Sequence, residues 1–298
     1  MNALYYSYMK DAEISFPMFG DLTLNPPATF HLFGIEIYYY GVIIAFGMVL
    51  AMIYCSRRAK SFGLTSDNLF DLLIWIIPLS IVGARLYYVA FKWSYYSARP
   101  EEIVQIWNGG LAIYGGIIMG LIVGIVWCRV KKISFFATAD LLSFGLLIGQ
   151  AVGRWGNFMN REAYGAETDI FCRMGLTYPG ASETYYVHPT FLYESLWNFT
   201  GFLILHFLYP KRAYDGQIAL GYCAWYGLGR AMIEGLRMDS LYWGSFRVSQ
   251  VLAAVGCVAA VAALVFLHFR PHDPEKLAER VYARKLEEKA ATEKTEQQ

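Results

Sequence analysis

The stretch ADLLSFGLLIGQAVGRWGNFMNREAYG, residues 139–165, decides the class of fold. Its first half is an apolar run that is long enough to lie in a membrane. Its second half places donors and charges within a few residues of one another. These are Arg154, Asn157, Asn160, Arg161 and Glu162. Polar side chains at the end of a membrane span are either interfacial anchors or parts of a site, and the rest of the sequence has to decide between them.

The composition indicates an integral membrane protein. Of the 298 residues, 56% are hydrophobic and only 16% are charged, and the mean hydropathy is +0.34. Soluble domains usually carry about 25% charged residues. The formal net charge of +1 does not indicate a nucleic-acid partner. The chain contains no HExxH motif, no DxxD pair and no Gly-Lys phosphate loop, so we expect neither a metal nor a cofactor.

Seven apolar runs of about 20 residues each predict an all-α fold with seven transmembrane helices. We expect an N-terminal segment over residues 1–32, a transmembrane domain over 33–269, and a charged, helical tail over 270–298. A polar, aromatic stretch over 159–188 is expected to form a small head between the fourth and fifth helices. The expected spans are 33–55, 69–91, 110–128, 138–158, 189–209, 217–236 and 247–269.

Basic residues in the short loops predict the orientation, because such residues favour the cytoplasmic side of a membrane. All of them fall on one face when seven spans are threaded through the membrane. The N-terminus and the head are therefore expected outside, and the C-terminus in the cytoplasm. The residues concerned are Arg57, Arg58, Lys60, Arg129, Lys131, Lys132, Lys211, Arg212 and Arg270.

Four other arginines depart from this bias. Arg85, Arg154, Arg230 and Arg237 fall near the outer ends of spans 2, 4 and 6. An arginine within a span is costly and usually faces protein or a water-filled cavity. Four of them at one depth predict an anion site near the headgroups of the outer leaflet.

Helical spacing groups the polar residues of spans 4 and 6. Arg154, Asn157 and Arg161 share one face if the helix continues through them. In span 6, a single polar stripe consists of Tyr226, Arg230, Glu234 and Arg237. Glu234 can pair with either arginine of that stripe. Two arginines against one glutamate leave a net positive charge, which suits an anionic ligand.

Several other residues have both a structural and a functional interpretation. His188 precedes a proline at the start of span 5 and is more often structural in such a place. Tyr114 can be a packing aromatic or a phenol at the site. Tyr38, Tyr39 and Tyr40 indicate an interfacial aromatic belt first and a site second. Glycines repeat every four residues in spans 3 and 4, which predicts that these two helices pack closely together.

Four blocks in this order carry a resemblance: GGLAIYGG, GRWGNFMNREAYG, HPTFLYES and YGLGRAMIEGLR. Over roughly residues 30–270 the chain resembles the bacterial phosphatidylglycerol–prolipoprotein diacylglyceryl transferase family. The resemblance implies a multi-pass enzyme of the bacterial cytoplasmic membrane, with an active site towards the outer leaflet. Its implied partners are the lipid bilayer, phosphatidylglycerol, and the signal peptide of a preprolipoprotein with its lipobox cysteine. The enzyme would transfer the diacylglyceryl group to that thiol and release glycerol phosphate.

The resemblance also implies roles for individual residues. Arg154 matches the arginine of the family signature, Arg230 matches a second essential arginine, and Tyr40 matches a site tyrosine of span 1. Around them, the matching positions are Asn157, Asn160, Glu162, Gly165, Tyr226 and Glu234.

The identity of the proton acceptor stays open at this point. Many family members have a histidine where this chain has Tyr114, so a histidine base at that position is excluded. The remaining acceptors are Tyr114, Glu162, His188 or the phosphate leaving group. A lipid or organic-anion transporter with an arginine-lined site is the alternative function, although the chain shows no internal repeat.

Overall fold

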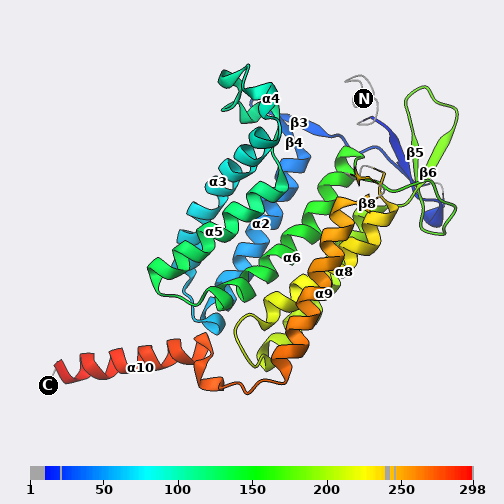
Figure 1. The fold of residues 1–298 in the computed structure, drawn as a ribbon. Helices are drawn as coiled ribbons and strands as arrows, with labels where there is room; N and C mark the ends of the chain where they lie inside the picture. Colours follow the sequence, from blue (N-terminus) through cyan, green and yellow to red (C-terminus); the bar gives the residue numbers. More distant parts are fainter. Residues whose placement is uncertain (1–10, 21, 239–241, 245, 297–298) are drawn as a thin grey trace. The chain divides into compact units, whose positions relative to one another are not determined.

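The computed structural model describes residues 11–20, 22–238, 242–244 and 246–296 (Figure 1). Parts of the expected N-terminal segment and tail, namely residues 1–10, 21 and 297–298, lie outside the described residues. The chain divides into two compact units. Unit 1 combines Met1–Tyr54 with Leu142–His272, and unit 2 combines Cys55–Leu141 with Asp273–Gln298.

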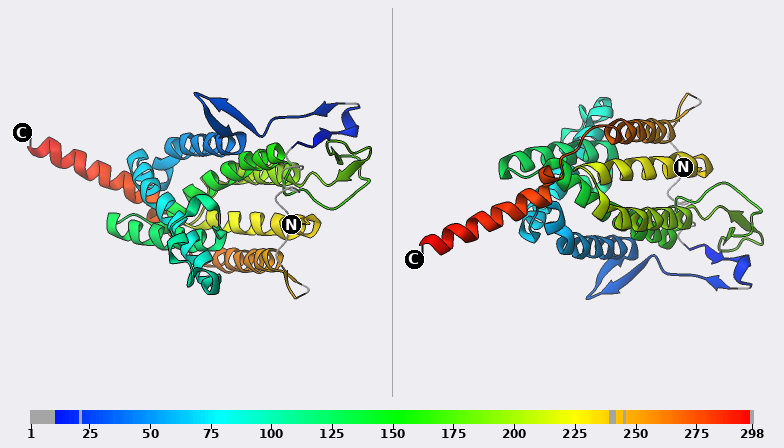
Figure 2. Two further views of the ribbon diagram at one scale, coloured as in Figure 1. Left: turned by 90° about the horizontal axis from the view of Figure 1, so that it is seen from above. Right: turned by 90° about the horizontal axis from the view of Figure 1, so that it is seen from below.

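Unit 1 contains most of α2 (Tyr39–Arg58) and of α6 (Phe135–Asn160), together with three further long helices. These are α7 (Thr190–Leu208), α8 (Gln217–Ile233) and α9 (Val248–His268). Its one-turn 3₁₀ helices are η1 (Pro17–Phe19), η5 (Tyr209–Lys211) and η6 (Glu234–Leu236). Helices α8 and α9 lie side by side (Figure 2), because Gly227 lets the backbone of α9 at Ala253 come close.

Unit 2 is organised around α3 (Ser66–Phe91) and α5 (Ile113–Lys131). Helix α3 begins at a capping box, in which the Thr65 side chain accepts from the Asn68 amide and the Asn68 side chain accepts from the Thr65 amide. The charged tail is helical, as expected, and forms α10 (Ala278–Glu296). The short elements of this unit are η2 (Ala59–Phe62), α4 (Trp93–Tyr96), η3 (Pro100–Glu102), η4 (Ile106–Asn108) and η7 (Pro274–Lys276).

All seven expected spans coincide with helices, and five of these are long and apolar enough to cross a membrane among the described residues. The five are α2 with η2, α3, α5, α6 and α9. Helices α7 and α8 occupy the other two expected positions. Helix α7 buries Glu194 and Asn198, and α8 is only 17 residues long. The mostly helical membrane fold is therefore confirmed, and the number of seven spans stays a prediction.

The first span was expected to begin at residue 33, and this is wrong by six residues. Residues Ile35–Tyr38 form strand β4, which pairs with β3 (Thr29–Leu32) in an antiparallel hairpin. Phe33 and Gly34 form its turn with positive φ values of 51° and 79°. The alternation of Ile35 and Ile37 with polar or aromatic neighbours favours a strand over a helix at this point.

The glycine repeats have more partners than the one expected, although Gly124 of α5 does lie against Phe135 of α6, 3.7 Å from a Cβ at that position. In α5, Gly115 and Gly116 lie against α3, where a Cβ on Gly115 would overlap Tyr87. In α6, Gly153 lies against Ile44 of α2. Gly115, Gly116 and Gly153 therefore permit close helix packing, as small residues do in membranes.

A four-stranded sheet was not foreseen, and it joins the N-terminal segment to the head. Its order is β2-β1-β5-β6, with antiparallel pairing throughout. A small core lies under this sheet and includes Ile14, Leu176 and Phe191. The strands are β1 (Glu13–Ser15), β2 (Thr23–Leu24), β5 (Met174–Thr177) and β6 (Thr184–Val187), and a separate hairpin consists of β7 (Tyr242–Trp243) and β8 (Phe246–Arg247).

Arg161 fixes the N-terminal segment to the end of α6. The helix ends at Asn160, and Arg161 itself has a φ of 49°, so it does not share a face with Arg154 as expected. Its guanidinium is 2% exposed and donates to the carbonyl oxygens of Ala12 at 3.0 Å and Pro26 at 2.6 Å. Burial lowers the pKa of this guanidinium, and the carbonyl contacts satisfy its donors. Arg161 is therefore a structural residue.

Reciprocal tryptophan packing holds α7 against α8. The indoles of Trp197 and Trp225 stack with centroids 4.4 Å apart, and each indole N–H donates to the carbonyl of the other residue. Each ring covers a glycine of the opposite helix, Trp197 on Gly229 and Trp225 on Gly201. This packing places Glu194 of α7 beside Arg230 of α8.

We predict that Gly229→Ala destabilises the protein by about 1–3 kcal/mol, because the added methyl group overlaps the Trp197 indole. Thermal unfolding in detergent measures the effect. Gly149→Ala is the matched control, since nothing lies within 4 Å of a Cβ at that helical position. A Gly229→Ala protein as stable as the Gly149→Ala protein would contradict the prediction.

Candidate active site

Glu194 is the centre of an ion cluster that joins three helices of unit 1. It lies one turn inside α7 and is only 4% exposed. Its Oε2 lies 2.5 Å from Nη2 of Arg154 in α6 and 3.4 Å from Nη1 of Arg230 in α8. Its Oε1 lies 3.2 Å from Nη1 of Arg237, directly after η6. One buried carboxylate thus holds three arginines of the sequence prediction together.

Glu234 supplies the second buried carboxylate. Its Oε2 lies 2.6 Å from Nη2 of Arg230, one turn earlier in the same stripe. Its backbone carbonyl accepts a hydrogen bond of 2.8 Å from Nη1 of Arg247. Glu194 and Glu234 therefore bring the guanidiniums of Arg154, Arg230 and Arg237 into one cluster of ion pairs.

The two central arginines are accessible although their carboxylate partners are not. The side chains of Arg154 and Arg230 are 21% and 18% exposed, against 5% for Glu194 and 2% for Glu234. Carboxylates in such a place neutralise part of the charge and fix the guanidiniums, while an anion can approach from the exposed side. The arrangement is suited to binding a phosphate group.

Glu162 is connected to Arg154 through an amide. Nη1 of Arg154 donates to Oδ1 of Asn157 at 3.0 Å, and Nδ2 of Asn157 donates to Oε1 of Glu162 at 2.9 Å. Asn160 donates to the same oxygen at 3.3 Å. Glu162 is exposed, so its carboxylate is accessible to a substrate. This series of hydrogen bonds, from Arg154 through Asn157 to Glu162, brings three residues of the family signature together.

Gly165 brings the loop before α7 against η6. Its amide donates to the carbonyl of His188 at 2.9 Å, and the residue forms a bridge with Arg237. A Cβ at Gly165 would lie 2.7 Å from that of His188 and 2.9 Å from the carbonyl of Leu236. Only a glycine permits this approach, which explains its place in the signature.

His188 lies at the edge of this arrangement. Its Nδ1 is 3.4 Å from the hydroxyl of Tyr193, and its backbone pairs with Gly165 and Ala166. Burial lowers the pKa of the imidazole below its ordinary value of 6.5. The ring is therefore neutral at pH 7.

We predict that acid destabilises the native state partly through His188. Its pKa is lower in the folded state, so the unfolded chain takes up this proton first as the pH falls below 6.5. The stabilisation is present above pH 6.5 and is lost as the pH falls from there towards the folded-state pKa. Thermal midpoints measured from pH 7.5 to 5 should fall less for His188→Gln than for the parent. Parallel curves would contradict this assignment.

Two tyrosines of the prediction lie in unit 1. The ring of Tyr40, in the first turn of α2, covers Gly156 of α6, where a Cβ would lie 2.7 Å from the ring. Tyr226 of α8 stacks on Tyr222 with centroids 5.6 Å apart. The Tyr222 hydroxyl accepts a hydrogen bond of 2.8 Å from Gln150 of α6. Tyr40 therefore contacts α6, and Tyr226 lies on α8 itself.

Arg85 and Tyr114 belong to unit 2. Tyr114 lies in the first turn of α5 and is half-buried. The Arg85 guanidinium is enclosed by backbone carbonyls, with Nε 2.8 Å from Ile103 O and Nη2 2.7 Å from Glu102 O. It also donates to the carbonyls of Gln105, Gly109 and Gly110. All five N–H groups thus hold the loop that precedes α5, so these contacts give Arg85 a structural role.

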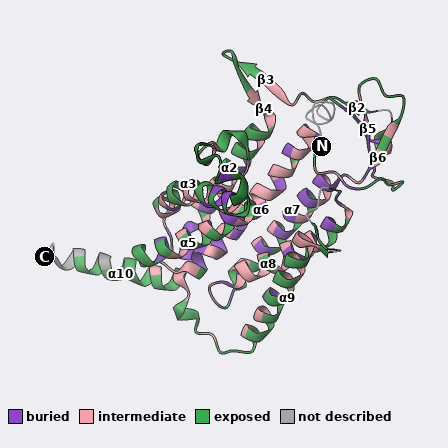
Figure 3. Cartoon of the chain, turned by 45° about the horizontal axis from the view of Figure 1, so that its top comes forward, coloured by how far each residue is buried: buried purple, intermediate pink, exposed green. Residues whose placement is uncertain are grey.

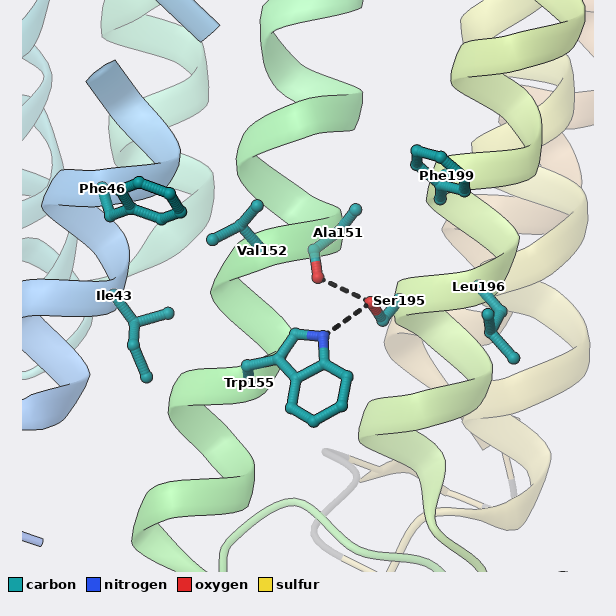
Figure 4. A pocket seen from close by; sticks show the side chains of 8 residues that line it. All are labelled: Ile43, Phe46, Ala151, Val152, Trp155, Ser195, Leu196 and Phe199. Carbon is teal, nitrogen blue, oxygen red and sulfur yellow. Dashed lines mark hydrogen bonds between the residues drawn. The ribbon is translucent and has the colours of Figure 1, made fainter. Parts of the chain in front are cut away.

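Unit 1 also contains an apolar cavity of about 500 Å³ (Figure 4). Its polar contacts are confined to Ser195, whose hydroxyl donates to Ala151 O at 2.8 Å and accepts from the Trp155 indole at 3.1 Å. Trp155 and Ser195 directly follow Arg154 and Glu194 in the sequence. The cavity residues, from α2, α6 and α7, are Ile43, Phe46, Ala151, Val152, Trp155, Ser195, Leu196 and Phe199.

The sequence analysis missed Glu194 as a site residue. A carboxylate one turn inside an apolar helix was a usable signal, because such a group needs a buried partner. It also missed Arg247, which contacts the backbone of Glu234 and the hydroxyl of Tyr242. The contact with Glu234 joins residues that are 13 positions apart, and the contact with Tyr242 crosses the hairpin β7–β8.

The fold and the site together define a membrane protein with an arginine–glutamate cluster and an apolar cavity in the same unit. Comparisons with known sequences are more specific: the family profile described as prolipoprotein diacylglyceryl transferase matches residues 27–266. The chain therefore belongs to the prolipoprotein diacylglyceryl transferase family, and it is a transferase.

Curated relatives agree with this assignment. A protein of Listeria monocytogenes is 44% identical over 254 residues, which cover 83% of this chain and 92% of the relative. One of Bacillus licheniformis is 41% identical over 266 residues, covering 86% and 98%. One of Limosilactobacillus reuteri is 45% identical over 250 residues, covering 81% and 90%. All three are named phosphatidylglycerol–prolipoprotein diacylglyceryl transferase, and none of them supports the transporter alternative.

Proposed function

We propose that this chain transfers the diacylglyceryl group of phosphatidylglycerol to the lipobox cysteine thiol of a preprolipoprotein. Glycerol phosphate is the second product, and the reaction is the first step of lipoprotein maturation. The observation that carries the proposal is the cluster of Arg154, Arg230 and Arg237 on Glu194, in which the side chains of Arg154 and Arg230 keep an exposed side. Such a cluster fits the phosphate of the lipid headgroup, and the relatives' names include this lipid.

In the proposed reaction, the thiolate attacks the glycerol carbon that bears the phosphate. The carbon–oxygen bond breaks, and the phosphate oxygen keeps the electron pair. Arg154 and Arg230 stabilise the charge that collects on this leaving group, because both guanidiniums are fixed before the reaction begins. The same cations favour the thiolate over the thiol.

We assign Glu162 as the group that accepts the proton of the substrate thiol. Its carboxylate is exposed, and one amide separates it from Arg154, so an incoming thiol can reach it beside the phosphate site. Geometry comes before pKa in choosing a general base. His188 is the second candidate, because its imidazole is neutral at pH 7. Tyr114 of unit 2 and the phosphate itself are the remaining acceptors.

The apolar cavity supports a lipid substrate. It is lined almost entirely by hydrocarbon and aromatic groups, and it begins one residue from Arg154 in α6 and one residue from Glu194 in α7. A phosphate at the arginines would therefore leave an acyl chain within reach of the cavity. A soluble anion would have no use for it.

We further propose that the protein is a multi-pass protein of the bacterial cytoplasmic membrane with its site towards the outer leaflet. Support comes from the basic residues at the ends of α2 and α5, Arg57, Arg58, Arg129 and Lys131, which favour the cytoplasmic side. Arg154 lies at the opposite end of α6 from the start of that helix at Phe135. In this orientation the head and the signature segment lie outside.

A transfer assay tests the proposed function. The purified chain is incubated with phosphatidylglycerol labelled in its diacylglyceryl part and with a peptide that contains a lipobox cysteine. We expect label on the peptide and none on a Cys→Ser peptide. Movement of labelled lipid between vesicle leaflets without peptide labelling would overturn the proposal in favour of a transporter. Glu162→Gln, His188→Gln and Tyr114→Phe variants then identify the proton acceptor, by the pH dependence of kcat.

A further inference from the structure

The hairpin β3–β4, immediately before α2, has one apolar face. The strand register pairs Phe30 with Ile37 and Leu32 with Ile35. Residues directly opposite one another in an antiparallel pair project to the same face, so these four apolar side chains share one face. His31 pairs with Glu36 and lies on the other face. The hairpin is therefore amphipathic.

Phe33 at the turn of this hairpin is unusual in two respects. It is 96% exposed, and its φ of 51° lies in the left-handed region. Two-residue turns of this kind favour Asn, Asp or Gly at such a position, and an aromatic residue there is strained. The neighbouring Leu32 and Ile35 are 47% and 67% exposed. Within the described structure, this apolar tip is not covered.

The hairpin is fixed to the first turn of a membrane span. The amide of Tyr39 donates to the carbonyl of Ala28 at 3.0 Å, which closes the base of the hairpin onto α2. The ring of Phe30 lies 4.9 Å from that of Tyr39. Figure 3 shows the hairpin leaving the start of α2 with exposed residues towards its tip. Its position relative to α2 is thus set by direct contacts.

Helix α2, which follows the hairpin directly, carries exposed apolar side chains of its own. Along that helix, Phe46 and Val49 are 57% and 51% exposed, as expected of side chains that meet lipid tails. The three tyrosines at residues 38–40 lie between the two surfaces, and tyrosines concentrate at the headgroup level. The hairpin thus begins at the depth of the membrane interface.

The length of the hairpin decides how it lies there. Four residues per strand extend about 13 Å, whereas each headgroup region is only about 5–8 Å thick. A hairpin standing upright would hold its apolar tip in water. A hairpin lying along the surface would place Phe33, Leu32 and Ile35 in the acyl boundary and His31 and Glu36 in the headgroups.

We propose that the hairpin β3–β4 is an interfacial anchor that inserts its apolar face and Phe33 into the membrane surface beside α2. The partner is a lipid surface. The anchor sets the depth and tilt of the first turn of α2, and therefore of Tyr40, whose ring covers Gly156 beside Arg154. The proposed anchor does not depend on which reaction takes place at the ion cluster, so it is independent of the proposed function.

Photo-crosslinking in vesicles tests the anchor with the full chain. Benzoylphenylalanine is placed at position 33 or 35, on the apolar side, and at position 31 or 36, on the polar side, in vesicles of phosphatidylglycerol and phosphatidylcholine. Mass spectrometry then measures the fraction of protein that carries one phospholipid. We expect several-fold more lipid adduct from positions 33 and 35 than from positions 31 and 36.

Two outcomes would overturn the anchor. One is an equal yield of lipid adduct from both faces, or none from position 33. The other is a lipobox peptide that becomes crosslinked at position 33 and displaces the lipid adduct, which would make the hairpin a peptide-docking element. Thermal unfolding of each variant in detergent shows that the four proteins are folded. Neither outcome would affect the transfer assay.

Discussion

Arg154→Ala is expected to lower the rate of diacylglyceryl transfer by about 10²–10³-fold, the usual effect of removing one donor to a developing negative charge. Nη2 of Arg154 contacts Glu194 at 2.5 Å, yet the side chain remains 21% exposed. It is therefore both fixed and accessible to a phosphate. The kcat of peptide labelling, with phosphatidylglycerol in excess, measures the effect.

Two controls sharpen this prediction. Arg154→Lys keeps the charge but loses the fork that can bind two phosphate oxygens, so we expect partial activity. Arg173→Ala removes a guanidinium whose contacts are the carbonyls of Asp169 and Ile170 and the ring of Tyr186, and we expect full activity. Undiminished transfer by a normally expressed Arg154→Ala protein would exclude the proposed role.

Glu194→Gln is expected to have the largest effect on stability. The substitution keeps the shape of the side chain but leaves Arg154, Arg230 and Arg237 without their shared carboxylate. Removing one partner of a buried ion pair typically costs about 3–5 kcal/mol. The free energy of unfolding in detergent, and the amount of folded protein recovered, measure the effect.

A double substitution tests whether the loss comes from uncompensated charge. Arg237→Gln removes the arginine that contacts Oε1 of Glu194, which is the least exposed of the three arginines. In the Glu194→Gln background this change should restore part of the stability, because it removes one of the guanidiniums that Glu194 neutralised. Additive losses in the double variant would show that Glu194 acts through packing.

The helices could be predicted from the sequence because each apolar run is a local pattern. Six of the seven expected spans begin within three residues of the observed helices, while the run starting at residue 33 includes the strand Ile35–Tyr38. Strand β1 could not be predicted, because Glu13–Ser15 is too short to show a pattern. Its pairing with β5 depends on residues far along the chain.

Three of the four arginines that the sequence grouped together lie in one ion cluster, and their role in binding an anion stays a prediction. Helical spacing grouped Arg230, Glu234 and Arg237, and the position of Arg154 at a span end marked it as unusual. Glu194 escaped because its three partners lie on other elements, and sequence alone does not show which helices face one another. The contacts of Arg85 with backbone carbonyls could not be predicted, because no pattern of side chains in the sequence indicates them.

The pairing of β1 with β5 has a consequence for how the protein is assembled during synthesis. Ile14 pairs with Leu176, and Arg161 donates to carbonyls of residues 12 and 26. Both contacts can form only after the later part of the chain has been synthesised. A three-residue strand is not stable alone. We therefore expect strands β1 and β2 to remain open to proteases until β5 has been synthesised. Closure of this sheet would then be a late event in maturation of the head, detectable by pulse-chase proteolysis.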